Sequence, residues 1–275
     1  MWESFVTLNW PAKQSARGEP DNHATVPAAK YPLVWETLPQ PQEVFLLPSG
    51  WNNYPKWDQI ESLPAGLTVS GAKALGEGYS PKTDIVLYDV NQPNTSIRAG
   101  PVAPLMDQYR RYVRYQVAMN RSYFDYIRSH SYFDAEVQRQ AVRVTEQAQY
   151  SDQSTAPDGG FVGLPADHVD EPGMLEIKSA WRGLDPKLDQ TQRYYSRPGF
   201  ILSPDRKYFA TAPAGVGLVA LHIHRMTRLS HVASTFEHID NVALPDDSTT
   251  HKLHPSFNPR VGNATHTNGC PRMEI

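Results

Sequence analysis

The segment from Gly215 to Asn241, GVGLVALHIHRMTRLSHVASTFEHIDN, most constrains the fold because it predicts a β-hairpin. Its first half is a run of apolar and β-branched residues, and VASTFEHI in its second half is typical of another strand. Successive strand side chains point to opposite faces, so His222 and His224 share a face, about 6.5–7 Å apart. A three-residue loop over 229–231 would place His222 directly opposite His238. We therefore expect three imidazoles on one face of the hairpin.

Three imidazoles in this arrangement can bind a transition-metal ion or form an acid/base centre. H-x-H on one strand presents two ligands, a neighbouring strand supplies the third, and a position stays open for water. His222, His224 and His238 are thus candidate ligands of a divalent metal such as Zn, Fe or Cu. Bound zinc would lower the pKa of water to about 7 for hydrolysis, with Glu176 as fourth ligand or general base. In the alternative interpretation His222 and His238 are hydrogen-bonded core residues and His224 faces solvent.

A second pattern, E-I-K, places Glu176 and Lys178 on an apolar strand. Three acidic residues precede it: Asp158, Asp167 and Asp170. Metal-dependent nucleases use such carboxylates to hold Mg²⁺ and the lysine to orient the attacking water. The candidate catalytic residues are Glu176, Lys178 and His238. The alternative is that Glu176 and Lys178 form a partly buried pair on a sheet face. The net charge is −3 and no basic stripe is present, so we expect no nucleic-acid partner.

The run QYRRYVRY at 108–115 interleaves arginine with aromatic residues, a pattern that can stack bases and grip phosphates. A solvated sheet face is the favoured interpretation, because acidic residues elsewhere can neutralise the arginines. Near the C-terminus, His251, His254, His266 and Cys270 match no ligand spacing of a zinc site. We expect that stretch to be an exposed linker.

Composition excludes several classes of protein. The chain has 275 residues and a single cysteine, Cys270, so it can form neither an internal disulfide nor a C-x-x-C-H haem attachment. No apolar run reaches the roughly 18 residues of a transmembrane helix, and we expect none. The N-terminal MWESFVTLNWPAK has neither the basic nor the long apolar segment of a signal peptide.

The alternation of apolar and polar residues predicts a single α+β domain over 1–244, with a mostly antiparallel sheet flanked by two helices and long irregular terminal segments. Asn120 is the expected N-cap of the first helix, and the second helix covers about 134–147. The expected strands are 85–90, 112–119, 173–181, 193–202, 207–211 and the two strands of the histidine hairpin. Residues 245–275 are expected to form a flexible tail that contains proline and histidine.

Five blocks of the sequence carry a family resemblance. They are FVTLNWPA with RGEPD (5–21), VWET with EVFL (34–46), PLMDQYRRYVRYQVAMNRSYFDYI (104–127), MLEIKSAW (174–181) and GLVALHIH with STFEHIDN (217–241). In this order they resemble a group of bacterial exported proteins described as the cytochrome c family. The resemblance implies a periplasmic or secreted protein whose signal peptide was removed or is absent. It does not imply haem chemistry, because covalent haem needs two thiols and this chain has one.

Two functions follow as expectations. The first is an exported globular protein with a histidine-centred metal or acid/base site, such as a metal-dependent hydrolase or oxidoreductase. The alternative is a non-catalytic extracytoplasmic binding or interaction protein with structural histidines. Convergence of His222, His224 and His238 on a common point would favour the first, and a broad exposed aromatic patch would favour the second. The sequence identifies no particular small-molecule ligand or substrate and no oligomeric state.

Overall fold

The computed structural model describes residues 1–24, 32–45, 56–58, 85–87, 105–107, 109, 111–150, 163–169, 171–202, 209–212 and 214–241. Within these residues helices and mostly antiparallel strands are both present, so the predicted α+β class is confirmed. The predicted tail over 245–275 and its boundary lie outside the described residues.

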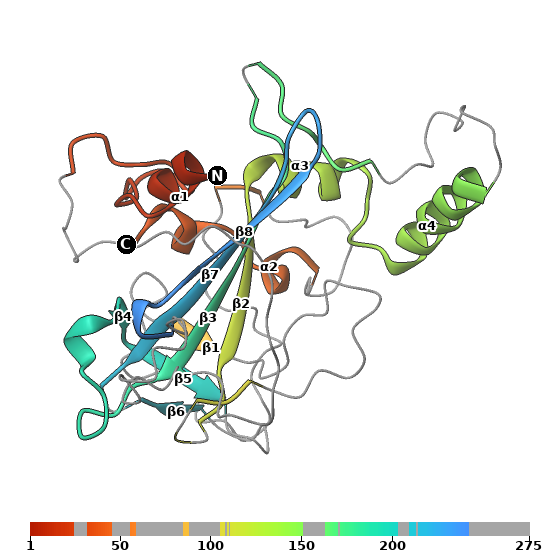
Figure 1. Ribbon diagram of the computed structural model, residues 1–275. Coiled ribbons are helices and arrows are strands. Elements are labelled where there is room, and N and C mark those ends of the chain that lie inside the picture. The colour runs from red at the N-terminus through yellow and green to blue at the C-terminus, as the bar shows by residue number, and fades with distance from the viewer. Residues whose placement is uncertain are drawn as a thin grey trace, which may run out of the picture. The chain divides into compact units, whose positions relative to one another are not determined.

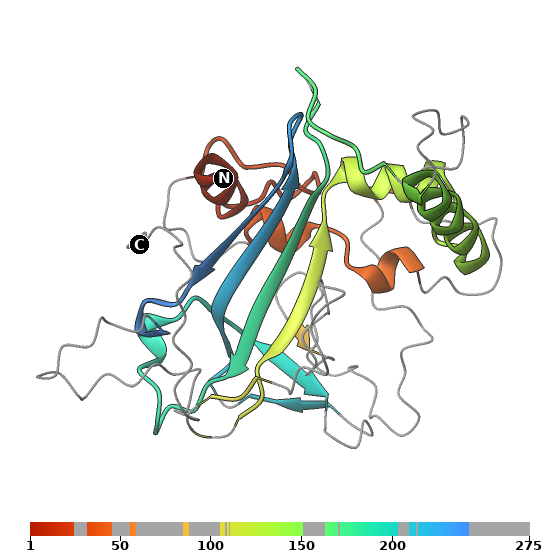
Figure 2. The same ribbon diagram turned by 45° about the vertical axis from the view of Figure 1, so that its right-hand side comes forward.

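The larger sheet has five strands in the order β2-β3-β7-β4, with β8 also paired to β7 (Figures 1 and 2). Its strands are β2 (Arg114–Met119), β3 (Leu175–Gly183), β4 (Ser196–Arg197), β7 (Val216–Met226) and β8 (His231–Glu237). β3 lies between two strands, and its residues 177–182 are all buried. Both faces of this strand are therefore covered, which explains why LEIKSAW lacks a clear polar face.

The smaller sheet has the order β1-β5-β6. It contains β1 (Ile85–Leu87), β5 (Gly199–Leu202) and β6 (Phe209–Thr211). β5 and β6 pair antiparallel, as predicted, whereas β1 runs parallel to β5. The predicted strand over 193–202 is divided, because Ser196 and Arg197 pair instead with Gly217 and Val216 of β7.

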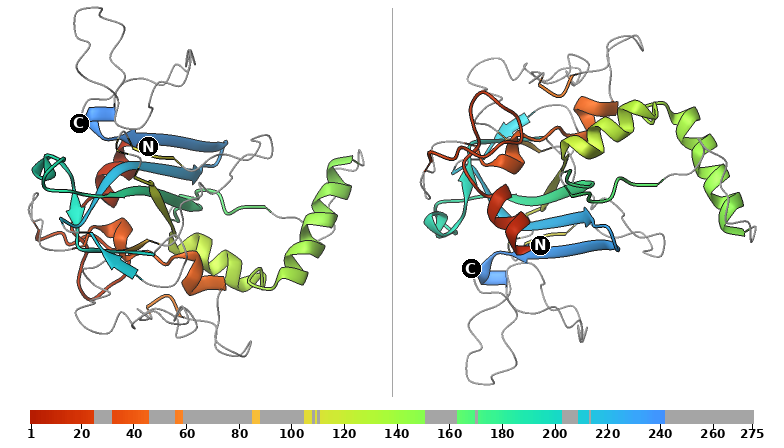
Figure 3. Two further views of the ribbon diagram at one scale, coloured as in Figure 1. Left: turned by 90° about the horizontal axis from the view of Figure 1, so that it is seen from below. Right: turned by 90° about the horizontal axis from the view of Figure 1, so that it is seen from above.

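The α-helices are α1 (Trp2–Leu8), α2 (Pro41–Phe45), α3 (Arg121–Ser129) and α4 (Ala135–Tyr150). Within the described residues, 3₁₀ turns cover Val34–Thr37, Thr191–Arg193 and Ile239–Asn241. The predicted cap of α3 is confirmed, because Oδ1 of Asn120 accepts the amide of Tyr123 (3.2 Å). Figure 3 shows α3 and then α4 continuing from the end of β2.

The chain forms two compact units, each built from segments far apart in the sequence. The first comprises Met1–Leu67, Val117–Ile177 and Ile223–Ser234. The second comprises Thr68–Gln116, Lys178–His222 and Thr235–Ile275. In the first unit the ring of Trp57 packs edge-on against Phe124, with centroids 5.6 Å apart. In the second, Val113, Tyr115, Ala180 and Val219 form a buried core cluster.

Candidate functional site

The β7–β8 hairpin has a register different from the one expected. The amide of Thr227 donates to the carbonyl of Ser230 (2.9 Å), so the loop contains only Arg228 and Leu229. The hydroxyl of Thr227 donates to the same carbonyl (2.8 Å) and accepts the amide of Ser230 (3.1 Å). These bonds stabilise a tight turn that lacks glycine and asparagine, the residues that usually identify one. The predicted three-residue loop over 229–231 is therefore wrong.

The observed register separates His238 from the other two predicted ligands. The amide of His238 donates to the carbonyl of Val219 (2.9 Å), and the ring of His222 is hydrogen-bonded to the hydroxyl of Thr235. Because strand side chains alternate, His238 is on the face of Val219, and His222 and His224 are on the other face. The predicted pairing of His222 with His238 is wrong, and these three histidines do not meet on one face.

A different histidine, His231, shares a face with His222 and His224, as was predicted for His238. As an odd-numbered residue of β8 it shares the face of the even-numbered residues of β7. Its Nε2 atom lies 3.0 Å from Nδ1 of His224, and the two ring centroids are 4.9 Å apart. Among the described residues, no group of three or more His, Cys, Asp or Glu side chains is placed to hold a metal ion.

The predicted Glu176–Lys178 pattern lies on β3, where each side chain has its own aromatic neighbour. Burial raises the pKa of Tyr123, and the charge of Glu176 raises it further. Nζ of Lys178 lies 5.8 Å from the ring centroid of Tyr115, and this lysine is buried. Of the preceding acidic residues, Asp167 forms an ion pair with Arg225 (3.0 Å), and Asp158 and Asp170 lie outside the described residues. The contacts of Lys178 and Asp167 favour the structural alternative.

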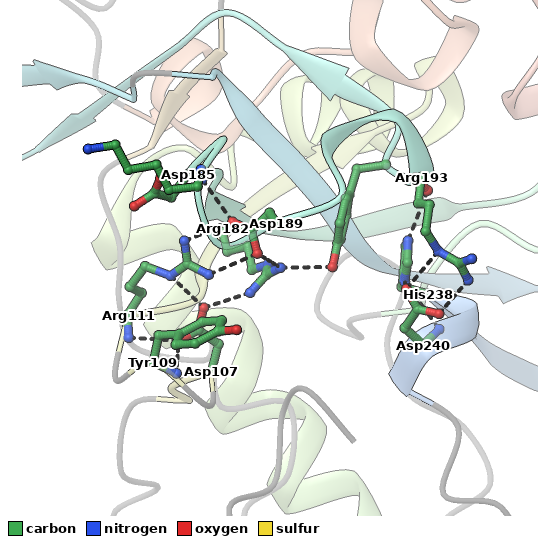
Figure 4. Close-up of polar contacts among 11 residues, drawn as sticks. Asp107, Tyr109, Arg111, Arg182, Asp185, Asp189, Arg193, His238 and Asp240 are labelled. Carbon is green, nitrogen blue, oxygen red and sulfur yellow. Dashed lines mark hydrogen bonds and ion pairs between the residues drawn. The ribbon is translucent and has the colours of Figure 1, made fainter. Parts of the chain in front are cut away.

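The strongest polar constellation lies in the second unit and consists of two arginines and two aspartates (Figure 4). The side chains of Asp107, Arg182 and Asp189 are almost fully buried. Arg182 donates to Asp107 (2.7 Å) and Asp189 (2.5 Å) through its two terminal nitrogens. Arg111 donates through Nε to Asp107 (2.7 Å) and through Nη1 to Asp189 (2.9 Å). We call these four residues the charge network.

Electrostatics favours the charged forms of Asp189 and Arg111 in the charge network. Burial alone would raise the pKa of Asp189, but hydrogen bonds from Arg111 and from the amide of Asp185, with the charges of Arg182 and Arg111, lower it from 3.8. Burial alone would lower the pKa of Arg111, and the hydrogen bonds and charges of Asp189 and Asp107 outweigh that effect and raise it. The two positive and two negative charges of the network cancel.

His238 is connected to the charge network through Tyr194. Nη2 of Arg182 donates to the hydroxyl of Tyr194 (2.8 Å), whose ring stacks on the imidazole of His238 with centroids 4.2 Å apart. The amide of Asp240 donates to Nδ1 of His238 (3.2 Å), so Nε2 carries the proton and donates to the carbonyl of Arg193 (3.0 Å; Figure 4). Both ring nitrogens therefore hold the backbone in place, as expected of a structural histidine.

The charge network shapes an exposed loop. The amide of Val113 donates to the carbonyl of Leu105 (2.8 Å) and closes the loop. Inside it, Oδ1 of Asp107 accepts the amides of Tyr109 (2.8 Å) and Arg111 (2.9 Å). Cζ of Arg111 lies 5.1 Å from the ring centroid of Tyr109 (Figure 4). The fixed positions of these backbone amides hold the aromatic side chain against the arginine.

Four large apolar or aromatic side chains in this region are 38–50% exposed. Three belong to this loop and one belongs to the loop that carries Asp189. They are Met106, Tyr109, Tyr112 and Leu188, and we call them the aromatic loop surface. The run 108–115 indicates this loop in the sequence, but no sequence pattern predicts a role for Asp107, Arg182 or Asp189. No local signal marks Arg182, because residues 177–182 are all buried and show no alternation of polar and apolar side chains.

No protein-family model, curated protein or solved structure matches the chain. In the part of the chain that the structure describes, no helix is long and apolar enough to cross a membrane.

Proposed function

We propose that the chain is a non-catalytic extracytoplasmic binding or interaction protein, and that the aromatic loop surface is its contact region. The observation that carries the proposal is a set of four exposed apolar side chains on two loops joined by one buried charge network. Tyr, Met and Arg are enriched where proteins meet, because they supply large contact areas. The extracytoplasmic setting rests on the family resemblance.

The charge network supports a binding role because its carboxylates have no acceptor position left for a reacting group. Asp107 accepts N–H groups from Tyr109, from Arg182 and twice from Arg111. Asp189 also accepts four, from Asp185, from Arg182 and twice from Arg111. A carboxylate offers about four acceptor sites. The network is therefore suited to hold two loops rigidly, which lowers the entropic cost of binding.

The partner that fits this surface is a protein or peptide segment with exposed apolar side chains. Arg111 and Arg182 are committed to aspartates, and Arg114 is buried. Among the described residues of this region, this leaves little unbalanced positive charge to attract a phosphate backbone, on which nucleic-acid affinity depends. Tyr109 and Tyr112 instead offer rigid rings with few rotatable bonds and a polar tip.

The experiment that tests the proposal is selection of peptide ligands against the full chain from a random library. Peptides rich in aromatic and aliphatic residues are expected. In a Tyr109→Ala, Tyr112→Ala double variant the affinity of a selected peptide should fall about 30-fold or more, since one interface hot spot contributes about 2 kcal/mol.

The matched control is a Val169→Ala, Leu229→Ala double variant, because these side chains are 88% and 96% exposed and lie outside the aromatic loop surface. The control should bind the peptide as the unmodified chain does. Equal affinity of the tyrosine variant and the unmodified chain for every selected peptide would contradict the proposed function.

A further inference from the structure

We propose that His224 and His231 form a surface site for a divalent transition-metal ion, with copper(II) as the preferred ion. The pair lies in the first unit, in the segment Ile223–Ser234. The inference is independent of the proposed binding function, because it uses no residue of the aromatic loop surface. It also differs from the site expected from the sequence, since His231 enters only through the observed register.

The distance between the two facing nitrogens suits a metal ion. Nδ1 of His224 and Nε2 of His231 are 3.0 Å apart, so one ring donates an N–H to the lone pair of the other. If that proton moves to the other nitrogen of the donating ring, both imidazoles remain neutral and both facing nitrogens present a lone pair. Metal binding then requires a tilt of the rings but no loss of a proton from the protein.

The preferred ion follows from ligand chemistry. Imidazole nitrogens suit Zn, Cu, Fe and Ni, and for a given set of ligands the affinity rises along the divalent first-row metals to Cu(II) and falls again at Zn(II). Two neighbouring imidazoles can fill two positions of the tetragonal geometry that Cu(II) adopts, so copper(II) should bind most tightly.

The hairpin holds both ligands in place before a metal arrives. His224 lies on β7, and His231 opens β8 after the two-residue loop that the Thr227–Ser230 bonds stabilise. His231 is exposed, so water can occupy the remaining coordination positions. The nearest arginine of β7 does not oppose the ion, because Arg225 points to the other face and is paired with Asp167 (3.0 Å).

The test is titration of the full chain with copper(II), followed by calorimetry and by electron paramagnetic resonance of the bound ion. All samples carry His251→Asn, His254→Asn, His266→Asn and Cys270→Ser, so that the C-terminal histidines and the thiol do not compete. One equivalent of copper should bind with two nitrogen ligands visible in the spectrum. Either His224→Gln or His231→Gln should weaken binding by at least about 10- to 100-fold, because loss of a hydrogen-bond partner of a metal ligand alone commonly costs that much.

The matched control is His222→Gln, on the same face of β7 but hydrogen-bonded to Thr235. This variant should keep the affinity and the two-nitrogen spectrum, and circular dichroism should show that all three variants are folded. The inference is overturned if the unmodified pair shows no saturable copper site. It is also overturned if binding survives both His224→Gln and His231→Gln, or falls equally in His222→Gln.

Discussion

Replacement of Arg182 by methionine should destabilise the protein more than any change to a surface charge. Arg182 is buried and donates to both Asp107 (2.7 Å) and Asp189 (2.5 Å). In Arg182→Met the two carboxylates would share one cation, Arg111, and the buried network would carry a net charge of −1. Methionine fills a similar volume, so the loss of charge compensation is the main effect.

Removal of one partner from a buried ion pair costs about 3–5 kcal/mol, because the remaining charge stays desolvated. An exposed pair gives the comparison, since Arg121 and Asp125 lie 3.4 Å apart on α3 with side chains 66% and 49% exposed. Arg121→Met should therefore cost less than about 1 kcal/mol. The ratio of the two effects follows from burial alone.

A double variant separates charge imbalance from lost packing. With Arg182→Met and Asp189→Leu together, Asp107 and Arg111 remain as a balanced pair at 2.7 Å. The double variant should therefore be more stable than the sum of the two single effects predicts, by about 1–3 kcal/mol.

The assay is urea unfolding followed by far-ultraviolet circular dichroism at pH 7 for Arg182→Met, Asp189→Leu, the double variant and Arg121→Met. A loss of stability in Arg182→Met no larger than in Arg121→Met would refute the reasoning. Strict additivity in the double variant would show that the charges are not coupled.

Three further predictions concern stability. The pKa of Asp189 is lowered in the folded state, so its stabilising effect is present above pH 3.8 and is lost as the pH falls through the lower folded value. Between pH 7 and pH 3 the urea midpoint should therefore fall more in the unmodified chain than in Asp189→Asn. Parallel curves for the two proteins would contradict this. Asn120→Ala removes side-chain bonds to Tyr123, Gly173 and Leu175 and should cost about 2 kcal/mol, and an unchanged melting temperature would count against that role. Gly215→Ala should cost more than about 1 kcal/mol in a thermal scan, because the glycine has φ of +77° and an added Cβ would clash with the carbonyl oxygen of Arg197. A neutral result would show that the turn relaxes.

Local features of the fold could be predicted from the sequence. The hairpin of β7 and β8 follows from alternating apolar residues, and the start of α3 from the capping preference of Asn120. The register of the hairpin could not be predicted, because it depends on the hydroxyl of Thr227 in a turn without glycine. The expected register pairs His222 with His238, whereas the observed one pairs it with Thr235, three residues earlier in β8. This shift places His238 on the other face and brings His231 to the face of His224.

The charge network could not be predicted because its members are distant in the sequence. Arg111 and Asp189 are 78 positions apart, and Asp107 and Arg182 are 75 apart. An isolated aspartate in a loop has no local signal that distinguishes a buried partner from a solvated surface group. The aromatic run was visible, but the exposure of its tyrosines depends on how Asp107 folds the loop.

The central claim, that the aromatic loop surface is the contact region, is tested most directly by chemical-shift mapping of a selected peptide on the ¹⁵N-labelled full chain. We predict that the largest shifts fall in residues 105–113 and 184–190. The largest shifts in the hairpin over 222–235, with residues 105–113 unchanged, would contradict the claim.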